Sequence, residues 1–539
     1  LKGPLSVRVS LVQGRSHGPR ERMQAQASGL HRRSVALAED AGQSQAPSKP
    51  RARRYCDRLC CGVASVVLLT SASVLLEIVQ EIGQLAVHRL TADPRHADLL
   101  PGPQGSFLLQ MQQPPPERGA HLQHYSSQKC GNSWKTGVSA YVAPRDLSRP
   151  SWTWQHHAPN MWHPPVIDGA GNIYLAMYAI DLVSLTADGR LRWRAQVGIS
   201  KDPSRGHVSA PLLLGGFVYA TDGEAFLVKL SLETGAEQWR VRYTWDFESM
   251  GNNALSGNGG TVLLTGSCSQ WLRPYCKTTL LALDADDGHV LWKQVAGPFG
   301  PEVHANKNPA VTEDSVVVMD NHGATICYDL ANGTIRWWGI AAPSMDALPG
   351  VRVTGGAAVG PNGVVYADAA HWTGGRELGY VAAFDHGSGS RLWLRTLELP
   401  AKNVPSVYAA GGRPLVVVGL GSRLVSAVSP SFPPEAPERG MVVALDGGTG
   451  DTVWSFEPPP SACRQCNPER WSSAAVGADG VVYIGHCDGV VYALNGTNGA
   501  LLSSHATGSA ISANPAIAPG MLVVASCTQT TAFRSGPGP

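Results

Sequence analysis

The chain carries almost no excess of charge of either sign, since 43 Lys and Arg residues stand against 41 Asp and Glu residues. This balance argues against the basic surface that nucleic-acid binding requires. The sequence also lacks a G-x-S-x-G elbow, a phosphate-binding loop and an H-E-x-x-H helix. The usual signatures of hydrolases, nucleotide-binding proteins and zinc proteases are therefore missing. We expect no nucleic-acid partner and no familiar catalytic motif.

A motif of the form A-x-D-x-x-x-G-x-x-x-W recurs along most of the chain, in a sequence rich in glycine and proline. Its copies include ALDADDGHVLW, AFDHGSGSRLW and ALDGGTGDTVW, and each follows an apolar, β-branched run such as GVVYADA. The Asp favours a turn, the Gly accepts a positive φ, and the Trp brings a large apolar surface with one N–H donor. The Trp residues are predicted to dock against the neighbouring unit, and they are Trp193, Trp239, Trp292, Trp337, Trp393 and Trp454.

The spacing of these Trp residues, roughly 45 to 60 residues, is typical of four-stranded propeller blades. A seventh copy, ALNGTNGALLS, has Ser503 in the Trp position, and three strand-like runs without a fourth follow it. The stretch PSWTWQH, with Trp152 and Trp154, precedes the first unit and can supply that fourth strand. The sequence thus predicts an all-β protein with one eight-bladed β-propeller of four-stranded blades over residues 146–535. Closure of the ring removes exposed sheet edges.

The part of the chain before the propeller has a different composition. Residues 1–60 are polar and Arg-rich, which is typical of a disordered or targeting region. Residues 61–90 contain the uncharged apolar run Gly62 to Leu76, which predicts a short apolar helix. This run is shorter than the ~20 residues that span a membrane and near the upper limit for a signal peptide. Residues 91–145 are predicted to form a linker.

The apolar run favours a secretory signal or a single membrane anchor. Arg residues precede the run, and for an anchor this arrangement leaves the C-terminal part on the non-cytoplasmic side. We therefore expect an extracellular protein, or a membrane-anchored one with a lumenal propeller. An organelle transit region and an ordinary amphipathic helix are the alternatives.

The repeated motif resembles the tryptophan-docking motif of quinoprotein alcohol dehydrogenases and of the wider PQQ-like β-propeller repeat group, which includes bacterial outer-membrane assembly scaffolds. The resemblance extends from near Trp152 to Phe533. It implies a PQQ-like propeller. Because the motif marks packing rather than chemistry, it implies the fold more strongly than any activity.

For an active quinoprotein dehydrogenase, the resemblance implies a calcium ion, an Asp base, a Trp under the quinone and a ring of two adjacent cysteines. Adjacent cysteines occur here only as Cys60 and Cys61, before the propeller, and no acidic cluster resembles a calcium loop. The sequence therefore favours a non-enzymatic interaction or ligand-binding scaffold, with no cofactor expected. The alternative is a PQQ-dependent oxidoreductase that acts on alcohols or sugars and binds PQQ with Ca²⁺.

In a propeller, the loops from the second to the third strand and from the fourth strand to the next blade share one rim. Polar and aromatic residues gathered there predict a site for a protein partner or a small ligand. For each residue taken alone, a solvated loop position is the plain alternative. The candidates are His163, His207, Asn253, His304, Asn306, Lys307, His322, Trp372, Arg376 and His486.

Two cysteine pairs are candidates for disulfides. Cys268 and Cys276 bracket SQWLRPY between two strand-like runs, where a hairpin can bring them within bonding distance. Cys463 and Cys466 form a C-x-x-C in a Pro-flanked loop. Asn467 follows where a c-type haem site requires His, and no βαβ context suggests thioredoxin-like chemistry. We expect this pair to form a local disulfide or to remain as free thiols. The alternative is a role in metal binding or redox chemistry.

Overall fold

The computed structural model describes residues 124–535 with internal gaps. The expected regions 1–60 and 61–90 lie outside the described residues. Within the part of the chain that the structure describes, no helix is both long and apolar enough to cross a membrane. The gaps are residues 157–162, 178–180, 199–207, 223–224, 244–254, 267–278, 296–307, 321–322, 344–350, 353–354, 374–375, 422–438 and 464–469.

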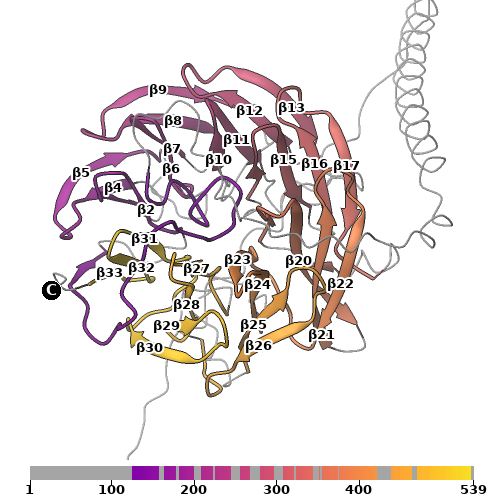
Figure 1. The fold of residues 1–539 in the computed structure, drawn as a ribbon. Helices are drawn as coiled ribbons and strands as arrows, with labels where there is room; N and C mark the ends of the chain where they lie inside the picture. The colour runs from indigo at the N-terminus through magenta and orange to yellow at the C-terminus, as the bar shows by residue number, and fades with distance from the viewer. Residues whose placement is uncertain are drawn as a thin grey trace, which may run out of the picture. The chain divides into compact units, whose positions relative to one another are not determined.

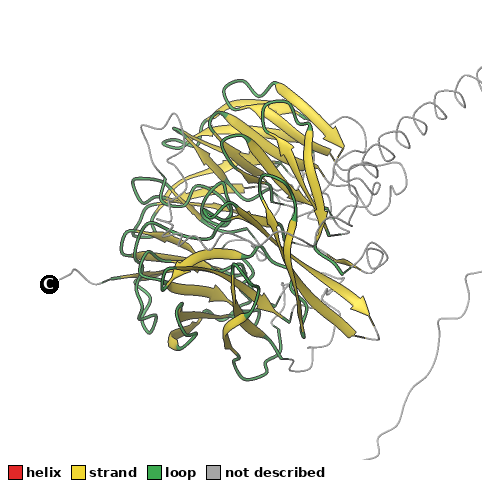
Figure 2. Ribbon diagram, turned by 45° about the vertical axis from the view of Figure 1, so that its right-hand side comes forward, coloured by secondary structure: helices red, strands yellow, loops and turns green. Residues whose placement is uncertain are grey.

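The described residues form eight antiparallel sheets, and these follow one another around a ring (Figure 1). Strands and loops make up the whole of the described ring (Figure 2). In blades one to four, six and seven the first strand lies near the axis and the last at the perimeter. The all-β, eight-bladed prediction is thereby confirmed.

Blades one to four each contain four consecutive strands. They are β2 (Val166–Ile167), β3 (Ile173–Ala176), β4 (Asp181–Leu185) and β5 (Leu191–Gln196); β6 (Leu212–Leu214), β7 (Phe217–Thr221), β8 (Phe226–Ser231) and β9 (Glu237–Arg242); β10 (Leu255–Asn258), β11 (Thr261–Gly266), β12 (Thr279–Asp284) and β13 (Val290–Val295); and β14 (Ala310–Val311), β15 (Ser315–Met319), β16 (Ala324–Asp329) and β17 (Ile335–Ile340).

Blade five differs from the predicted four-stranded pattern, because β18 pairs with the far end of β20 as an additional strand. The strands of blades five to seven are β18 (Val351–Arg352), β19 (Ala357–Val359), β20 (Val364–Thr373), β21 (Arg376–Asp385) and β22 (Arg391–Leu397); β23 (Ser406–Ala410), β24 (Arg413–Leu420), β25 (Met441–Asp446) and β26 (Thr452–Phe456); and β27 (Ala475–Val476), β28 (Val481–Gly485), β29 (Val490–Asn495) and β30 (Leu501–Ala506).

Blade eight joins the two ends of the propeller sequence. Its inner strands are β31 (Ala516–Ala518), β32 (Met521–Ala525) and β33 (Gln529–Arg534), and its outer strand is β1 (Trp152–Gln155). Trp152 pairs with Ala532 in an antiparallel register. The predicted completion of the last blade by the strand near Trp152 is therefore confirmed.

The repeated motif forms the turn of the outer hairpin in blades one to seven, and blade five shows how. The Asp385 carboxylate at the end of β21 accepts hydrogen bonds from the amide and the hydroxyl of Ser388, both at 2.8 Å. These bonds lower the pKa of Asp385. The amide of Gly389 donates to the Asp385 carbonyl, and Gly389 has a φ of 72°. Glycine adopts this conformation at little steric cost.

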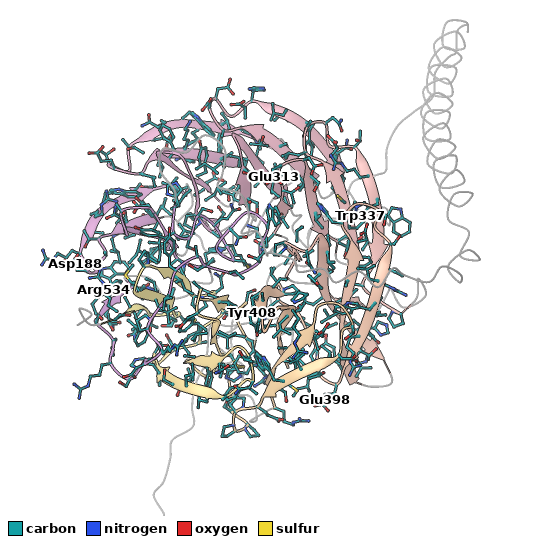
Figure 3. All side chains as sticks on the ribbon, in the orientation of Figure 1. Asp188, Glu313, Trp337, Glu398, Tyr408 and Arg534 are labelled. Carbon is teal, nitrogen blue, oxygen red and sulfur yellow. A yellow bond between two sulfur atoms is a disulfide. The ribbon has the colours of Figure 1, made fainter. Side chains whose placement is uncertain are left out.

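Each motif Trp reaches from the outer strand of one blade to the turn of the next. The Trp337 indole N–H donates to the His386 carbonyl at 2.7 Å, and its ring lies so close to Gly389 that a Cβ there would approach within 2.6 Å. Trp337 lies at the perimeter of the ring in Figure 3. The same N–H bond joins Trp193 to Leu232, Trp239 to Asp286, Trp292 to Leu330, Trp393 to Gly447 and Trp454 to Gly496.

The ring closes through the same contact. Trp152 in β1 donates its indole N–H to the Ala187 carbonyl of blade one at 2.9 Å. A Cβ on Gly189 would meet the Trp152 ring at 2.7 Å. Blade eight thus docks on blade one as the earlier blades dock on their neighbours.

The hydrophobic core lies between neighbouring sheets. Between blades four and five, Val317 and Trp337 pack with Val365 and Phe384 in one buried cluster. The rings of Trp337 and Phe384 stack with centroids 6.2 Å apart. Packing against its neighbours consequently contributes to the stability of a blade in addition to its own hydrogen bonds.

Replacing one motif Trp should destabilise the whole ring. We expect Trp292→Ala to lower the free energy of unfolding by roughly 3–5 kcal/mol, as other large-to-Ala changes in cores do. Trp292 is only 8% exposed, whereas Trp372 is 61% exposed and serves as the matched control. Urea unfolding measures both variants. Equal midpoints for Trp292→Ala and the parent would contradict the docking role.

Candidate functional site

The expected rim residues fall into two groups. Those outside the described residues are His207, Asn253, His304, Asn306, Lys307 and His322. Of the others, His163 is half-buried just before β2, and Trp372 and Arg376 lie at the end of the β20–β21 hairpin. The structure therefore does not show the predicted residues gathered into one polar site.

The β20–β21 hairpin is the most prominent described feature of this rim. Its two strands have 10 residues each, and Trp372 near its end is 61% exposed. Trp372 pairs across the hairpin with Glu377. The Glu377 carboxylate forms an ion pair with Lys402, whose Nζ lies 2.6 Å from Oε1. Lys402 is buried. The ion pair and the added strand β18 thus anchor the hairpin that carries the exposed Trp372.

His486 differs from the expected rim residue because its side chain is only 1% exposed. Its ring lies 4.3 Å from the Trp471 ring, and its Nδ1 is 3.0 Å from the Asp488 carboxylate. These contacts hold the imidazole of His486 within the β28–β29 turn. His486 therefore lies within the turn and is not exposed on the rim.

The cysteine next to His486 corrects the local pairing expected for the C-x-x-C. Cys463 is bonded to Cys487, which lies in the β28–β29 turn, and not to Cys466. The disulfide ties the loop after β26 to that turn. Cys466, Cys268 and Cys276 lie outside the described residues. Among the described cysteines Cys527 is also disulfide-bonded, while Cys130 and Cys327 are free and buried.

Residues 126–139, called the axial segment below, line the centre of the ring rather than forming a linker. The innermost strands donate backbone N–H groups to its carbonyls: Leu213 to Ser127 and Val311 to Ser133 at 2.7 Å, Val359 to Trp134 at 2.9 Å, and Val407 to Thr136, Val476 to Gly137 and Ile167 to Ser126 at 2.8 Å. The indigo trace enters the middle of the ring in Figure 1. The last part of the expected linker 91–145 is therefore part of the propeller.

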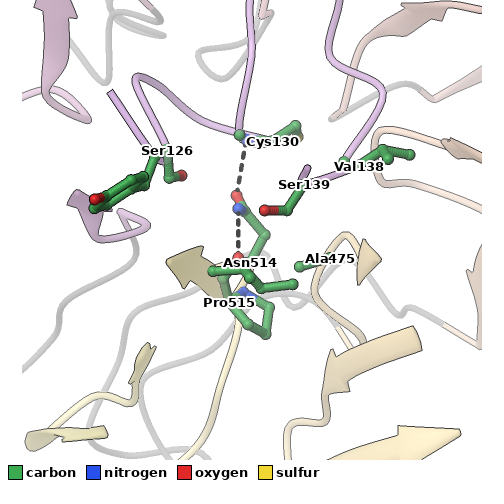
Figure 4. Close-up of a pocket in the computed structure, with 11 residues that line it drawn as sticks. Ser126, Cys130, Val138, Ser139, Ala475, Asn514 and Pro515 are labelled. Atoms are coloured by element: carbon green, nitrogen blue, oxygen red, sulfur yellow. Dashed lines mark hydrogen bonds between the residues drawn. The ribbon is translucent and has the colours of Figure 1, made fainter. Parts of the chain in front are cut away.

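Side chains complete the contacts of the axial segment with the remaining two blades. The Gln128 amide donates to the Gly257 carbonyl at 3.1 Å and accepts from its N–H at 3.3 Å, as a neighbouring strand would. The Cys130 N–H donates to the Asn514 side chain at 3.2 Å (Figure 4). Burial raises the pKa of the Cys130 thiol. The axial segment thus contacts all eight blades.

Residues 140–148, called the seam segment below, run between blades seven and eight. Ser503 occupies the motif Trp position in β30, and its hydroxyl bonds the Arg145 carbonyl and accepts the Leu147 N–H. Leu147 is fully buried, and Arg145 pairs with Asp479 at 2.8 Å. The chain itself therefore fills the one interface whose motif lacks Trp.

A quinone with calcium at the level of the axial segment would have to displace that segment. In the described residues, one cluster of Asp and His side chains could hold a metal ion, and it consists of Asp284, Asp287 and His289. It belongs to a motif turn at the perimeter, where Asp284 accepts backbone N–H groups as Asp385 does. The described axis accordingly does not fit an axial quinone.

The axial and seam segments are not predicted from the sequence, because neither contains the repeated Trp motif. Their one local signal is the run SSQKCGNSWKTGVSAY, whose small residues are unlike the polar, Arg-rich start of the chain. Gly137 shows why small residues are needed, because a Cβ there would meet the Ala474 carbonyl oxygen at 2.7 Å.

Comparison with known proteins places this architecture in a family. The family model described as "Outer membrane protein assembly factor BamB" matches residues 146–393, 245–431 and 438–535. These matches cover the ring up to the end of β33.

Individual relatives are distant. The "Outer membrane protein assembly factor BamB" of Shewanella oneidensis is 25% identical over 51% of this chain and 62% of its own length. The "Alcohol dehydrogenase (quinone), dehydrogenase subunit" of Komagataeibacter europaeus is 23% identical over 48% of this chain and 34% of its own. The chain thus spans less than two thirds of either relative. The crystal structure of BamB from Moraxella catarrhalis superimposes with a TM-score of 0.51 at 17% identity, covering 71% of this chain and 100% of that chain.

Peptide mapping without reduction tests the disulfide. We expect a linked pair of tryptic peptides that contain Cys463 and Cys487, because the fold brings them together across 24 residues. Trypsin cleaves after Arg464 and so separates Cys463 from Cys466. Recovery of Cys463 linked to Cys466 would contradict the structure.

Proposed function

Because the chain belongs to the family whose model is described as "Outer membrane protein assembly factor BamB", we propose that it is a non-catalytic scaffold that holds protein partners at the rim of its propeller. The observation that carries this proposal is the axial segment, which fills the centre of the ring with the chain's own backbone. The accessible surfaces that remain are the rim and the perimeter. The Shewanella relative is named as an assembly factor, which supports a role in binding.

The β20–β21 hairpin is the proposed contact surface for a protein partner. Trp and Arg dominate the binding energy of protein interfaces, and rigid presentation lowers the entropy lost on binding. Trp372 is exposed, while the Glu377–Lys402 ion pair and β18 fix the hairpin beneath it. His163 and Arg376, together with the candidates outside the described residues, form the rest of the proposed rim.

We place this function outside the cytosol. The Cys463–Cys487 disulfide fits an oxidising compartment. In this proposal the apolar run in residues 61–90 acts as a secretory signal or single anchor, so the propeller is extracellular or lumenal. The Shewanella relative is named for the assembly of outer membrane proteins, which lie outside the cytosol.

A rim substitution should separate binding from folding. We expect Trp372→Ala to reduce the recovery of chemically crosslinked partners from the native source by about tenfold, because a central aromatic anchor is removed. Leu392→Ala is the matched control, since Leu392 is 52% exposed on β22 away from the hairpin. Quantitative mass spectrometry of the crosslinks gives the comparison. Equal recovery with both variants would argue against the hairpin.

The dehydrogenase alternative is supported by the similarity to the Komagataeibacter protein and is tested separately. We expect the purified chain, supplied with PQQ and Ca²⁺, to reduce no electron-accepting dye in the presence of alcohols or sugars. The physical reason is the axial segment, which occupies the centre of the ring. Dye reduction that strictly requires both PQQ and Ca²⁺ would support the dehydrogenase alternative.

A further inference from the structure

The innermost strand of each blade has an open edge that faces the axis. Such an edge presents N–H and C=O groups that pair readily with another extended chain. Here the amides of Val359, Val407 and Val476 donate to consecutive parts of the axial segment at 2.8–2.9 Å. The ring therefore holds its axial segment through backbone hydrogen bonds, with several blades each contributing a donor. The segment itself turns, since Gly131 donates to the Gln128 carbonyl and Gly137 to the Cys130 carbonyl.

Most of these contacts use the backbone of the axial segment, so they recognise a peptide rather than a particular set of side chains. Gln128, whose side chain bonds both backbone groups of Gly257, and Gly137 are positions that select sequence. A Cβ at Gly137 would lie 2.7 Å from both the Ala474 carbonyl oxygen and the Ser406 hydroxyl, and Gly137 has a φ of 73°. The channel consequently accepts a peptide that turns as the axial segment does, with glycine at one fixed place.

The axial segment does not fill its channel completely. A cavity remains between it and blades seven and eight, with Cys130, Ser139, Ala475 and Asn514 in its lining (Figure 4). Ser126 also lines this cavity, and its hydroxyl is buried without a hydrogen-bond partner among the described residues.

The link between these segments and β1 is exposed. Residues 148–151 lie on the surface between the buried Leu147 and the half-buried Trp152. Cutting the backbone there leaves β1 in blade eight, and the axial and seam segments are then held by non-covalent contacts alone. The intact link keeps both segments at a high effective concentration next to the channel.

From these contacts we propose that the propeller channel is a peptide-binding site, filled in cis by the axial and seam segments and able to take a separate peptide of the same pattern once the link is cut. This site lies inside the ring and is distinct from the rim proposed to hold protein partners. Its ligand class is a peptide that follows the turns of the axial segment, with glycine at the position of Gly137.

The test uses the full chain with a protease recognition sequence inserted between Ser148 and Arg149. After cleavage we expect the protein to keep a cooperative thermal transition with residues 1–148 still bound. A fluorescent peptide of residues 124–148 should then exchange into the channel, with a saturable rise in anisotropy and release of the 1–148 fragment. The uncleaved protein should bind this peptide at least about 100-fold more weakly, because its own segment competes from a tether.

Two variant peptides test whether binding of the peptide is specific. Gly137→Val should abolish saturable binding, since the added side chain meets backbone and cannot readily adopt the positive φ. Ala140→Ser is the matched control, because Ala140 is exposed, and it should bind like the parent peptide. The proposal is wrong if cleavage abolishes the cooperative transition, if fragment 1–148 stays bound without exchange, or if Gly137→Val binds as well as the parent.

Discussion

The docking of an indole on the turn of the next blade is the contact on which the ring depends. Each such contact combines a hydrogen bond to a carbonyl, as from Trp337 to His386, with ring packing against a glycine that has no room for a Cβ. A small motif therefore fixes the position of one whole sheet against another. Because the core lies between sheets, loss of one indole affects two blades, and the contact from Trp152 to blade one makes the arrangement circular.

Closing a ring of eight sheets creates a second constraint at its centre, where eight inner edges meet. Buried backbone donors need acceptors, and the axial segment supplies them to Leu213 and Val359 among others. The same stretch of chain then continues as the seam segment, where Ser503 takes the place of the motif Trp. The need for backbone acceptors thus explains the axial segment, and the missing Trp explains the seam segment between blades seven and eight. The rim carries the exposed Trp372, the proposed contact for a protein partner.

The sequence predicted the architecture because the motif repeats. Aligned copies average out local ambiguity, and the leftover strands identified the closing strand at Trp152. Contacts that occur once could not be found in this way. The axial segment binds mainly through its backbone, which leaves little trace in residue types, and the Cys463–Cys487 bond depends on how the loop after β26 folds. His486 looked like a rim residue by its loop position, but Trp471 and Asp488 bury it.

Amide hydrogen exchange of the full-length protein tests most directly whether the chain's own segment occupies the axis. The informative amides are those of Leu213, Val359 and Val407, whose acceptors are carbonyls of the axial segment. If the account is correct, these amides exchange as slowly as the amides paired between β24 and β25 in the middle of blade six. Exchange at the rate of exposed loop amides, with the β24–β25 amides still protected, would show an open channel and contradict the account.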